Sequence, residues 1–97
     1  MAFFGISKDM PTGQLPLAEI SNCNDVGDFD GIRLDAITST TQNAPVSSQY
    51  GSLFSIQRKN GVVMQFAVMN FSAHIYARER YYNSSAVLVW SSWSNIT

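Results

Sequence analysis

The chain has 97 residues, of which 45% are hydrophobic and only 13% are charged, and its formal net charge is −1. This is the length of one globular domain, with roughly half of the usual charged share of about 25%. The near-neutral balance argues against a nucleic-acid partner, and no apolar run approaches the roughly 20 residues that span a membrane. A single cysteine, Cys23, excludes an internal disulfide and a cysteine-rich zinc site.

Abundant apolar residues with few charges are unusual for a fold of this size, which has little interior in which to bury them. We therefore expect another subunit to cover part of the apolar surface.

The chain begins with a segment that has no regular pattern. Residues 1–14 contain Gly5, Pro11 and Gly13 and show no sustained hydrophobic period, which predicts an extended arm or linker. The remainder, residues 15–97, is predicted to form one β-rich domain.

The next stretch is rich in turn-forming residues. Residues 15–20 have room for one helical turn, and residues 22–31 have the Asn, Asp and Gly content that is typical of turns. Apolar and charged residues then alternate from Ile32 to Ala36, which predicts a half-buried strand. Residues 38–49 are polar and predict a loop of about a dozen residues.

From Tyr50 onward the pattern is that of β-structure. Residues 53–57 predict a strand, and the Asn60-Gly61 pair predicts a tight hairpin turn. Residues 62–69 are apolar on both faces, which predicts a central strand or one packed on both sides.

The C-terminal part continues this pattern. Residues 73–80 predict a strand with His74, Tyr76, Arg78 and Arg80 on one face. A turn over 82–85, a last strand over 86–90 and a tail over 93–96 complete an antiparallel meander. The predicted fold is all-β, a small antiparallel sheet or sandwich behind an irregular first third.

The few charges are segregated along the chain. Six of the seven acidic residues lie in residues 1–35, and four of the six basic residues lie beyond them. This asymmetry predicts that the two parts are complementary neighbours, either within a subunit or between subunits.

The sequence offers no catalytic or metal-binding constellation. His74 is the only histidine, and no Ser or Cys accompanies it in the spacing of a nucleophilic site. A glycan hydrolase needs two acids roughly 5–9.5 Å apart, and Glu79 is the only acid beyond residue 35. The acidic stretch 25–31 fails the calcium-loop template, which would put Val26 and Ile37 at ligand positions. We expect no enzyme, no metal and no cofactor.

Arginine and aromatic side chains recur near the end of the chain. Aromatic planes and guanidinium forks suit the ring faces and the hydroxyl or carboxylate groups of sugars. The alternatives are arginines that are solvated or that pair with the N-terminal acids across a subunit boundary, and tryptophans that close the core. The candidate ligand-binding residues are Tyr76, Arg78, Arg80, Tyr81, Tyr82, Trp90 and Trp93.

Five short motifs follow one another in one order. They are Asn43-Ala44-Pro45, Tyr50-Gly51-Ser52-Leu53, Gln65-Phe66, Ile75-Tyr76-Ala77-Arg78-Glu79-Arg80 and Trp90-Ser91-Ser92-Trp93. Over residues 15–97 this order resembles the knob domains of bacteriophage tail fibres and of R-type pyocin fibres. A longer apolar run at residues 84–89 departs from the family's usual Gly-rich turn, and it marks a variable loop in which host specificity would differ.

The resemblance implies a homotrimeric knob at the tip of a virion tail fibre, folded in the bacterial cytoplasm. Its partners would be two further copies of itself and a host cell-surface polysaccharide or outer-membrane receptor, contacted through residues 42–49 and 81–85. No nucleic-acid binding and no membrane insertion are expected. The alternative is a structural trimerisation or connector module of the same fibre, with no ligand of its own.

Overall fold

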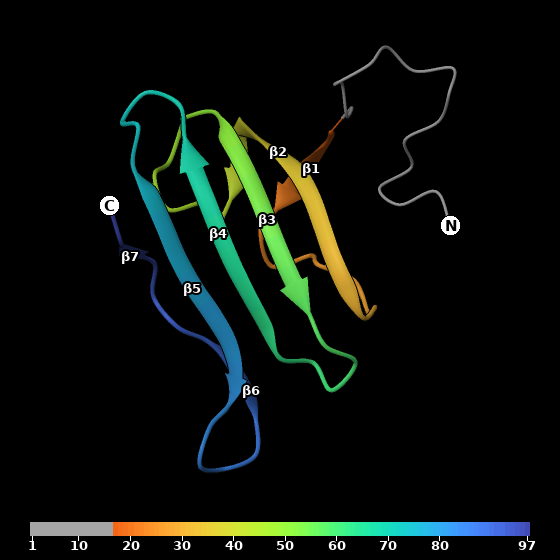
Figure 1. The fold of residues 1–97 in the computed structure, drawn as a ribbon. Coiled ribbons are helices and arrows are strands. Elements are labelled where there is room, and N and C mark those ends of the chain that lie inside the picture. The colour runs from red at the N-terminus through yellow and green to blue at the C-terminus, as the bar shows by residue number, and fades with distance from the viewer. Residues whose placement is uncertain (1–16) are drawn as a thin grey trace, which may run out of the picture.

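The computed structural model describes residues 17–97, so the predicted arm over residues 1–14 lies outside the described part. Residues 17–97 contain no helix and form one curled sheet in the order β1-β2-β3-β4-β5-β6, with β7 paired to β5 (Figure 1). The all-β prediction is therefore confirmed. The strands are β1 (Ala18–Asn22), β2 (Gly31–Gln42), β3 (Gly51–Gln57), β4 (Val63–Met69), β5 (Ile75–Tyr82), β6 (Leu88–Trp90) and β7 (Ser94–Asn95).

The β3–β4 hairpin forms at the predicted Asn60-Gly61 turn. The N–H of Arg58 donates to the carbonyl of Val62 over 3.0 Å, and the Asn60 side chain accepts a bond from the Val62 N–H over 3.1 Å. Gly61 has a φ of +94°, a conformation that glycine adopts without the steric cost of a side chain. The turn sets the register of β3 against β4, which pair from Gly51↔Met69 to Gln57↔Val63.

β5 lies two residues later than predicted because the β4–β5 turn is longer than its sequence indicated. The N–H of Met69 donates to the carbonyl of His74, and Ala73 closes the turn with a φ of +55°. His74 therefore precedes the strand. The predicted alternation of Tyr76, Arg78 and Arg80 on one face is confirmed by their pairing with alternate residues of β4.

Two predictions for the first half of the chain are wrong. Residues 18–20 of the predicted helical turn are the start of an edge strand, because β1 pairs with β2, and residues 15 and 16 lie outside the described part. The loop that was predicted over residues 38–49 begins only at Asn43, because β2 extends to Gln42. Thr41 makes this possible: its Oγ1 accepts the N–H of Thr38 and donates to the carbonyl of Ile20.

The sheet is mixed, which corrects the prediction of a purely antiparallel sheet or sandwich. β1 runs parallel to β2, and its pairing begins at Ala18↔Asp35. The chain between Asn22 and Asp35 supplies the dozen or so residues that a parallel crossover needs.

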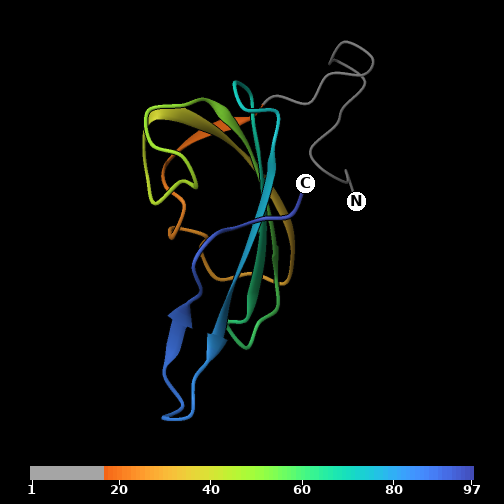
Figure 2. The same cartoon turned by 90° about the vertical axis from the view of Figure 1, so that its left-hand side faces the viewer.

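The core lies on one face of the sheet, which we call the inner face. A cluster of buried side chains fills one end of it, and β1, the loop after β2 and the segment around β6 lie on that side (Figure 2). The cluster consists of Ile20, Cys23, Ile37, Leu53, Ala67 and Met69. The opposite face, the outer face, has exposed apolar side chains on β3, β4 and β5.

Candidate functional site

Arg78 occupies the middle of the inner face and is the best-connected of the predicted ligand-binding residues. Its side chain is buried, and its Nε donates to Oε1 of Gln65 over 2.7 Å while Nη2 donates to Oδ1 of Asn24 over 2.8 Å. The guanidinium carbon lies 3.8 Å from the ring centroid of Trp90 and 4.5 Å from that of Trp93. Arg78 and the two indoles thus hold the end of the chain to the sheet.

A row of polar side chains continues from Arg78 across the inner face. Gln65 donates to the carbonyl of Cys23 over 2.7 Å and to Oγ of Ser55 over 3.1 Å. Gln57 donates to the carbonyl of Gly27 over 2.8 Å. These amides satisfy backbone carbonyls of the 23–30 connection, which therefore lies against the sheet although few apolar side chains attach it.

Burial sets the ionisation of the two groups at the centre of this row. Burial lowers the pKa of Arg78 to about 10, and proximity to Cys23 opposes the shift. Burial raises the pKa of the Cys23 thiol to about 11, with Arg78 opposing the shift. At neutral pH the guanidinium is charged and the thiol is neutral, so Cys23 is an unreactive core residue.

The remaining predicted ligand-binding residues differ in exposure. Arg80 donates from Nε to the carbonyl of Gly61 over 2.9 Å, and the Tyr82 hydroxyl donates to the carbonyl of Asn60 over 2.6 Å. Both side chains therefore hold the β3–β4 turn. Tyr82 is 50% exposed and Tyr81 is 39% exposed.

Tyr76 and Trp93 belong to the packing of the inner face. Both are partly buried against the core cluster, and the Trp93 indole N–H donates to the carbonyl of Asn43 over 2.9 Å. The structure thus brings five of the predicted residues into intramolecular contacts on the inner face. Those five are Tyr76, Arg78, Arg80, Trp90 and Trp93, and exposed Tyr81 and Tyr82 lie farther along β5.

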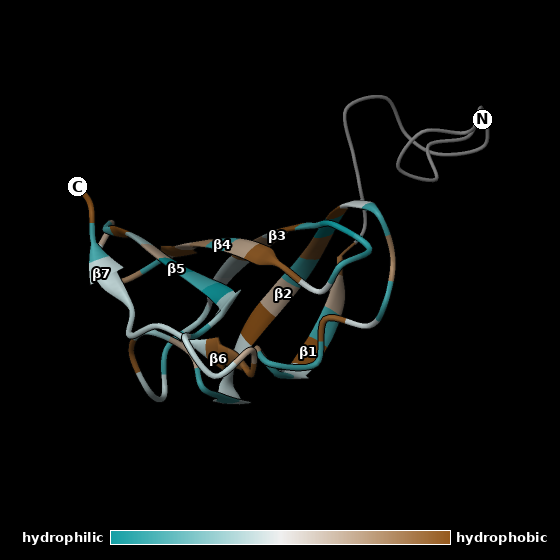
Figure 3. Cartoon of the chain, turned by 90° about the horizontal axis from the view of Figure 1, so that it is seen from below, coloured by the Kyte–Doolittle hydropathy of each residue, from teal (hydrophilic) through white to brown (hydrophobic). Residues whose placement is uncertain are grey.

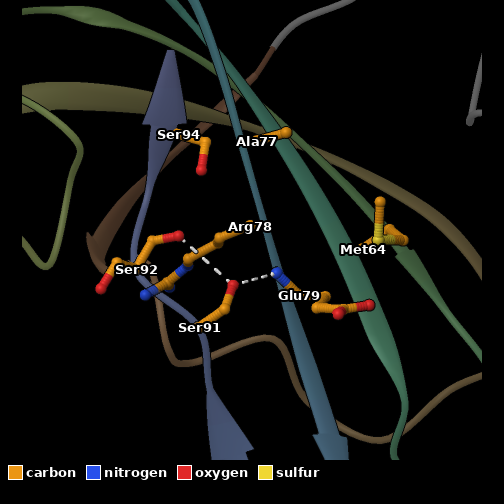
Figure 4. Close-up of a pocket in the computed structure, with 7 residues that line it drawn as sticks. All are labelled: Met64, Ala77, Arg78, Glu79, Ser91, Ser92 and Ser94. Atoms are coloured by element: carbon orange, nitrogen blue, oxygen red, sulfur yellow. Dashed lines mark hydrogen bonds between the residues drawn. The ribbon is translucent and has the colours of Figure 1, made fainter. Parts of the chain in front are cut away.

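A hollow of about 460 Å³ with a mixed polar and apolar lining lies where β5 faces the segment between β6 and β7 (Figure 4). Between its pairings with β6 and β7, this edge of β5 has no strand partner, and Ser91 satisfies the backbone groups of Glu79 instead. The Ser91 N–H donates to the carbonyl of Glu79, and the Ser91 Oγ accepts the Glu79 N–H over 2.9 Å. The lining combines hydroxyl, carboxylate, guanidinium and thioether groups. The lining residues are Met64, Ala77, Arg78, Glu79, Ser91, Ser92 and Ser94.

This lining has the chemistry of a site for a small polyhydroxylated ligand. The Ser92 and Ser94 hydroxyls can donate or accept hydrogen bonds, the Glu79 carboxylate can accept them, and Met64 supplies an apolar surface. The sequence reasoning considered Arg78 and the neighbouring tryptophans but missed Glu79 and Met64. Alternation on β5 indicates only that Glu79 and Arg78 lie on opposite faces, and both border one hollow because this edge of β5 has no partner between β6 and β7.

The segregated charges meet within the subunit. Arg58 lies 3.2 Å from the carboxylate of Asp30 and joins the two parts, whereas Arg33 donates over 2.7 Å to Asp35 of its own part. Arg78, by contrast, bonds amide oxygens and contacts aromatic rings. The prediction of complementary neighbours is confirmed for Arg58 and Asp30, which come from opposite halves of the chain.

Within residues 17–97, no three His, Cys, Asp or Glu side chains gather closely enough to hold a metal ion. The same part of the chain contains no helix that is long and apolar enough to cross a membrane. The acidic 25–31 stretch is a connection whose first turn is capped by Asn22, which accepts the N–H of Asn24 over 2.9 Å.

Comparison of the chain with protein-family models, with curated proteins and with solved structures gave no match. The resemblance to tail-fibre knobs therefore depends on the order of the sequence motifs alone.

Proposed function

We propose that this chain is a subunit of a homotrimeric tail-fibre knob that attaches a virion to a glycan or protein on the host cell surface. The observation that carries the proposal is the hollow beside β5, in which Ser92, Ser94 and Glu79 offer hydrogen-bonding groups next to the apolar Met64. Such a mixture binds sugars, whose rings have both apolar faces and hydroxyl edges. Three weak sites on one trimer act together and raise the overall affinity.

The motif order supports the proposal in a second way. Its last two motifs supply Arg78, Trp90 and Trp93, whose mutual contacts hold the C-terminal segment beside β5 and so form the wall of the hollow. In this proposal these residues position the site, and the ligand contacts come from Glu79 and the serines. Tyr81 and Tyr82, which are exposed on the same strand, extend the contact surface.

Binding of the purified chain to an array of bacterial surface polysaccharides tests the proposal. We expect Glu79→Gln to weaken binding roughly tenfold, because a hydrogen bond to a charged group contributes about 1.5–3 kcal/mol. Ser92→Ala should weaken binding by a smaller factor. The matched controls are Glu19→Gln and Ser21→Ala, which alter an exposed acid and an exposed serine away from the hollow. Equal binding by Glu79→Gln and Glu19→Gln would contradict the assignment of the site.

The second candidate function is a trimerisation or connector module without a ligand, and the exposed apolar outer face favours it. A trimer that binds no polysaccharide on the array and no host cell would establish this alternative.

A further inference from the structure

The outer face of the sheet is apolar across four adjacent strands. Its three cross-strand rows are Ile32–Ile56–Met64–Glu79, Leu34–Phe54–Phe66–Ala77 and Ala36–Ser52–Val68–Ile75. Glu79, at the end of one row, is the only charged residue among the twelve. In Figure 3 most of β4 is coloured as hydrophobic, whereas hydrophobic and hydrophilic segments alternate along β2.

These side chains are exposed although they are apolar. Ile32, Phe54, Ile56, Met64, Val68 and Ile75 keep between 38% and 49% of their surface accessible. A fully exposed large side chain has about 200 Å² of surface, so these six side chains together expose roughly 500 Å² of apolar surface. The half-buried members of the rows bring the exposed apolar area of the face to about 600 Å². This equals the largest patches of typical monomers and approaches the roughly 800 Å² that each partner contributes to a stable interface.

We propose that the outer face is the contact between copies of this chain. The centre of the occupant must be nearly uncharged, since Glu79 is the only charged residue in the three rows and the other charges, such as Glu19 beside Ala36, lie at the borders of the face. A second copy supplies a surface of the same size and the same lack of charge. The proposal deepens the proposed function, because it assigns the trimer contact to a particular surface.

The width of the face suits three copies. Four strands spaced about 4.8 Å apart give a face about 19 Å wide, and sheets pack about 10 Å apart. The centre of a triangle with 19 Å sides lies about 5.5 Å from each side, close to half of the spacing between packed sheets. Three such faces would therefore enclose a filled core, with the hollow beside β5 at the rim, because Met64 and Ala77 belong to both.

Mass measurement in solution on the full chain and two variants tests the proposal. The wild type is expected at three times the 10.7 kDa of the chain. Phe54→Lys places a charge at the centre of the face and should give monomers that keep the circular dichroism of a β-protein. Phe71→Lys is the matched control, because Phe71 is 76% exposed in the β4–β5 turn, away from the face, and this variant should remain trimeric. A trimeric Phe54→Lys variant would overturn the proposal.

Thiol labelling keeps the test decisive if Phe54→Lys fails to fold. Cys23 is fully buried, so an introduced cysteine reports its own exposure. We expect Ile56→Cys to react at least tenfold more slowly than Phe71→Cys. Equal rates in a trimer would overturn the outer-face contact and leave the trimer of the proposed function standing. A dimer with a protected Ile56→Cys would support the face and contradict the trimer. Protection of Ile56→Cys in a protein that remains monomeric would mean that the chain covers its own face, which also overturns the proposal.

Discussion

Replacing Arg78 by lysine tests whether the buried guanidinium holds the inner face together. The substitution keeps the positive charge but removes the planar fork that reaches both Gln65 and Asn24. It also removes the flat group that lies 3.8 Å from the Trp90 ring and 4.5 Å from the Trp93 ring. Arginine and lysine are not interchangeable at such a site.

The expected loss follows from these contacts. One of two charge-assisted hydrogen bonds is lost, at about 1.5–3 kcal/mol, and the ring contacts contribute about 0.5–2 kcal/mol. The lysine remains as buried as the arginine and still bears the cost of desolvation. We therefore expect Arg78→Lys to lower the free energy of unfolding by about 3 kcal/mol.

Urea unfolding at pH 7 and a fixed chain concentration measures this loss. Arg58→Lys is the matched control, since Arg58 contacts Asp30 with both side chains more than half exposed, and its change should stay within about 0.5 kcal/mol. If Arg78→Lys loses no more than Arg58→Lys, the contacts of Arg78 do not stabilise the fold and the reasoning is refuted.

Three further substitutions test other parts of the fold. Gly51→Ala should cost more than about 2 kcal/mol of unfolding free energy, because a Cβ there would lie 2.5 Å from the carbonyl oxygen of Val68, and an unchanged urea midpoint would contradict this. Folding raises the pKa of the Cys23 thiol from 9.0 to about 11, so between these pH values the unfolded chain loses the thiol proton and the folded chain keeps it. The free energy of unfolding of the wild type should therefore fall by about 1.4 kcal/mol per pH unit from pH 9 to pH 11. Cys23→Ala should remove this fall. Trp93→Phe should cost about 1 kcal/mol and speed amide hydrogen exchange in the loop after β2, because it removes the bond to the Asn43 carbonyl.

Local signals in the sequence were sufficient for the central sheet. The Asn60-Gly61 turn fixes its own hairpin through contacts within a few residues, and the alternation of Tyr76, Arg78 and Arg80 fixes which side chains share a face. Both features can be recognised from residues that are close together in the sequence, although Arg80 and Tyr82 also hold the turn. The β3–β4–β5 meander could therefore be predicted.

The edge of the sheet depends on contacts between distant residues, and here the sequence was insufficient. β1 is held by β2, including a bond from Thr41 to the carbonyl of Ile20, and β1 has no pattern that identifies it without this partner. Residues 38–41 (Thr-Ser-Thr-Thr) are polar enough to resemble a loop, yet the Thr41 hydroxyl satisfies backbone groups of Thr38 and Ile20.

The same limit applies to the candidate site. Alternation shows that Arg78 and Glu79 lie on opposite faces of β5, but it does not show which face the chain covers. Arg78 was a candidate for ligand binding because its guanidinium fork shares a face with aromatic side chains, and the structure puts it inside because Gln65 and Asn24 supply its hydrogen bonds. The identity of the covered face is a property of the 23–30 connection, whose path the sequence does not reveal.

In the middle of the sheet, the usual distribution of polar and apolar residues is reversed. The covered row Arg33–Ser55–Gln65–Arg78 is polar, whereas the uncovered row Leu34–Phe54–Phe66–Ala77 is apolar. Each hydrogen bond of the covered row contributes only about 1 kcal/mol net to stability, because on folding these groups exchange hydrogen bonds to water for hydrogen bonds to protein. Burying about 600 Å² of the apolar face contributes on the order of 15 kcal/mol, which is comparable to the 4–15 kcal/mol that association costs. In this middle part of the sheet the apolar side chains thus lie on the side that a lone subunit leaves in water, while the buried core cluster of the inner face lies at one end of the sheet. The low charge content of the outer rows fits the proposed contact between copies.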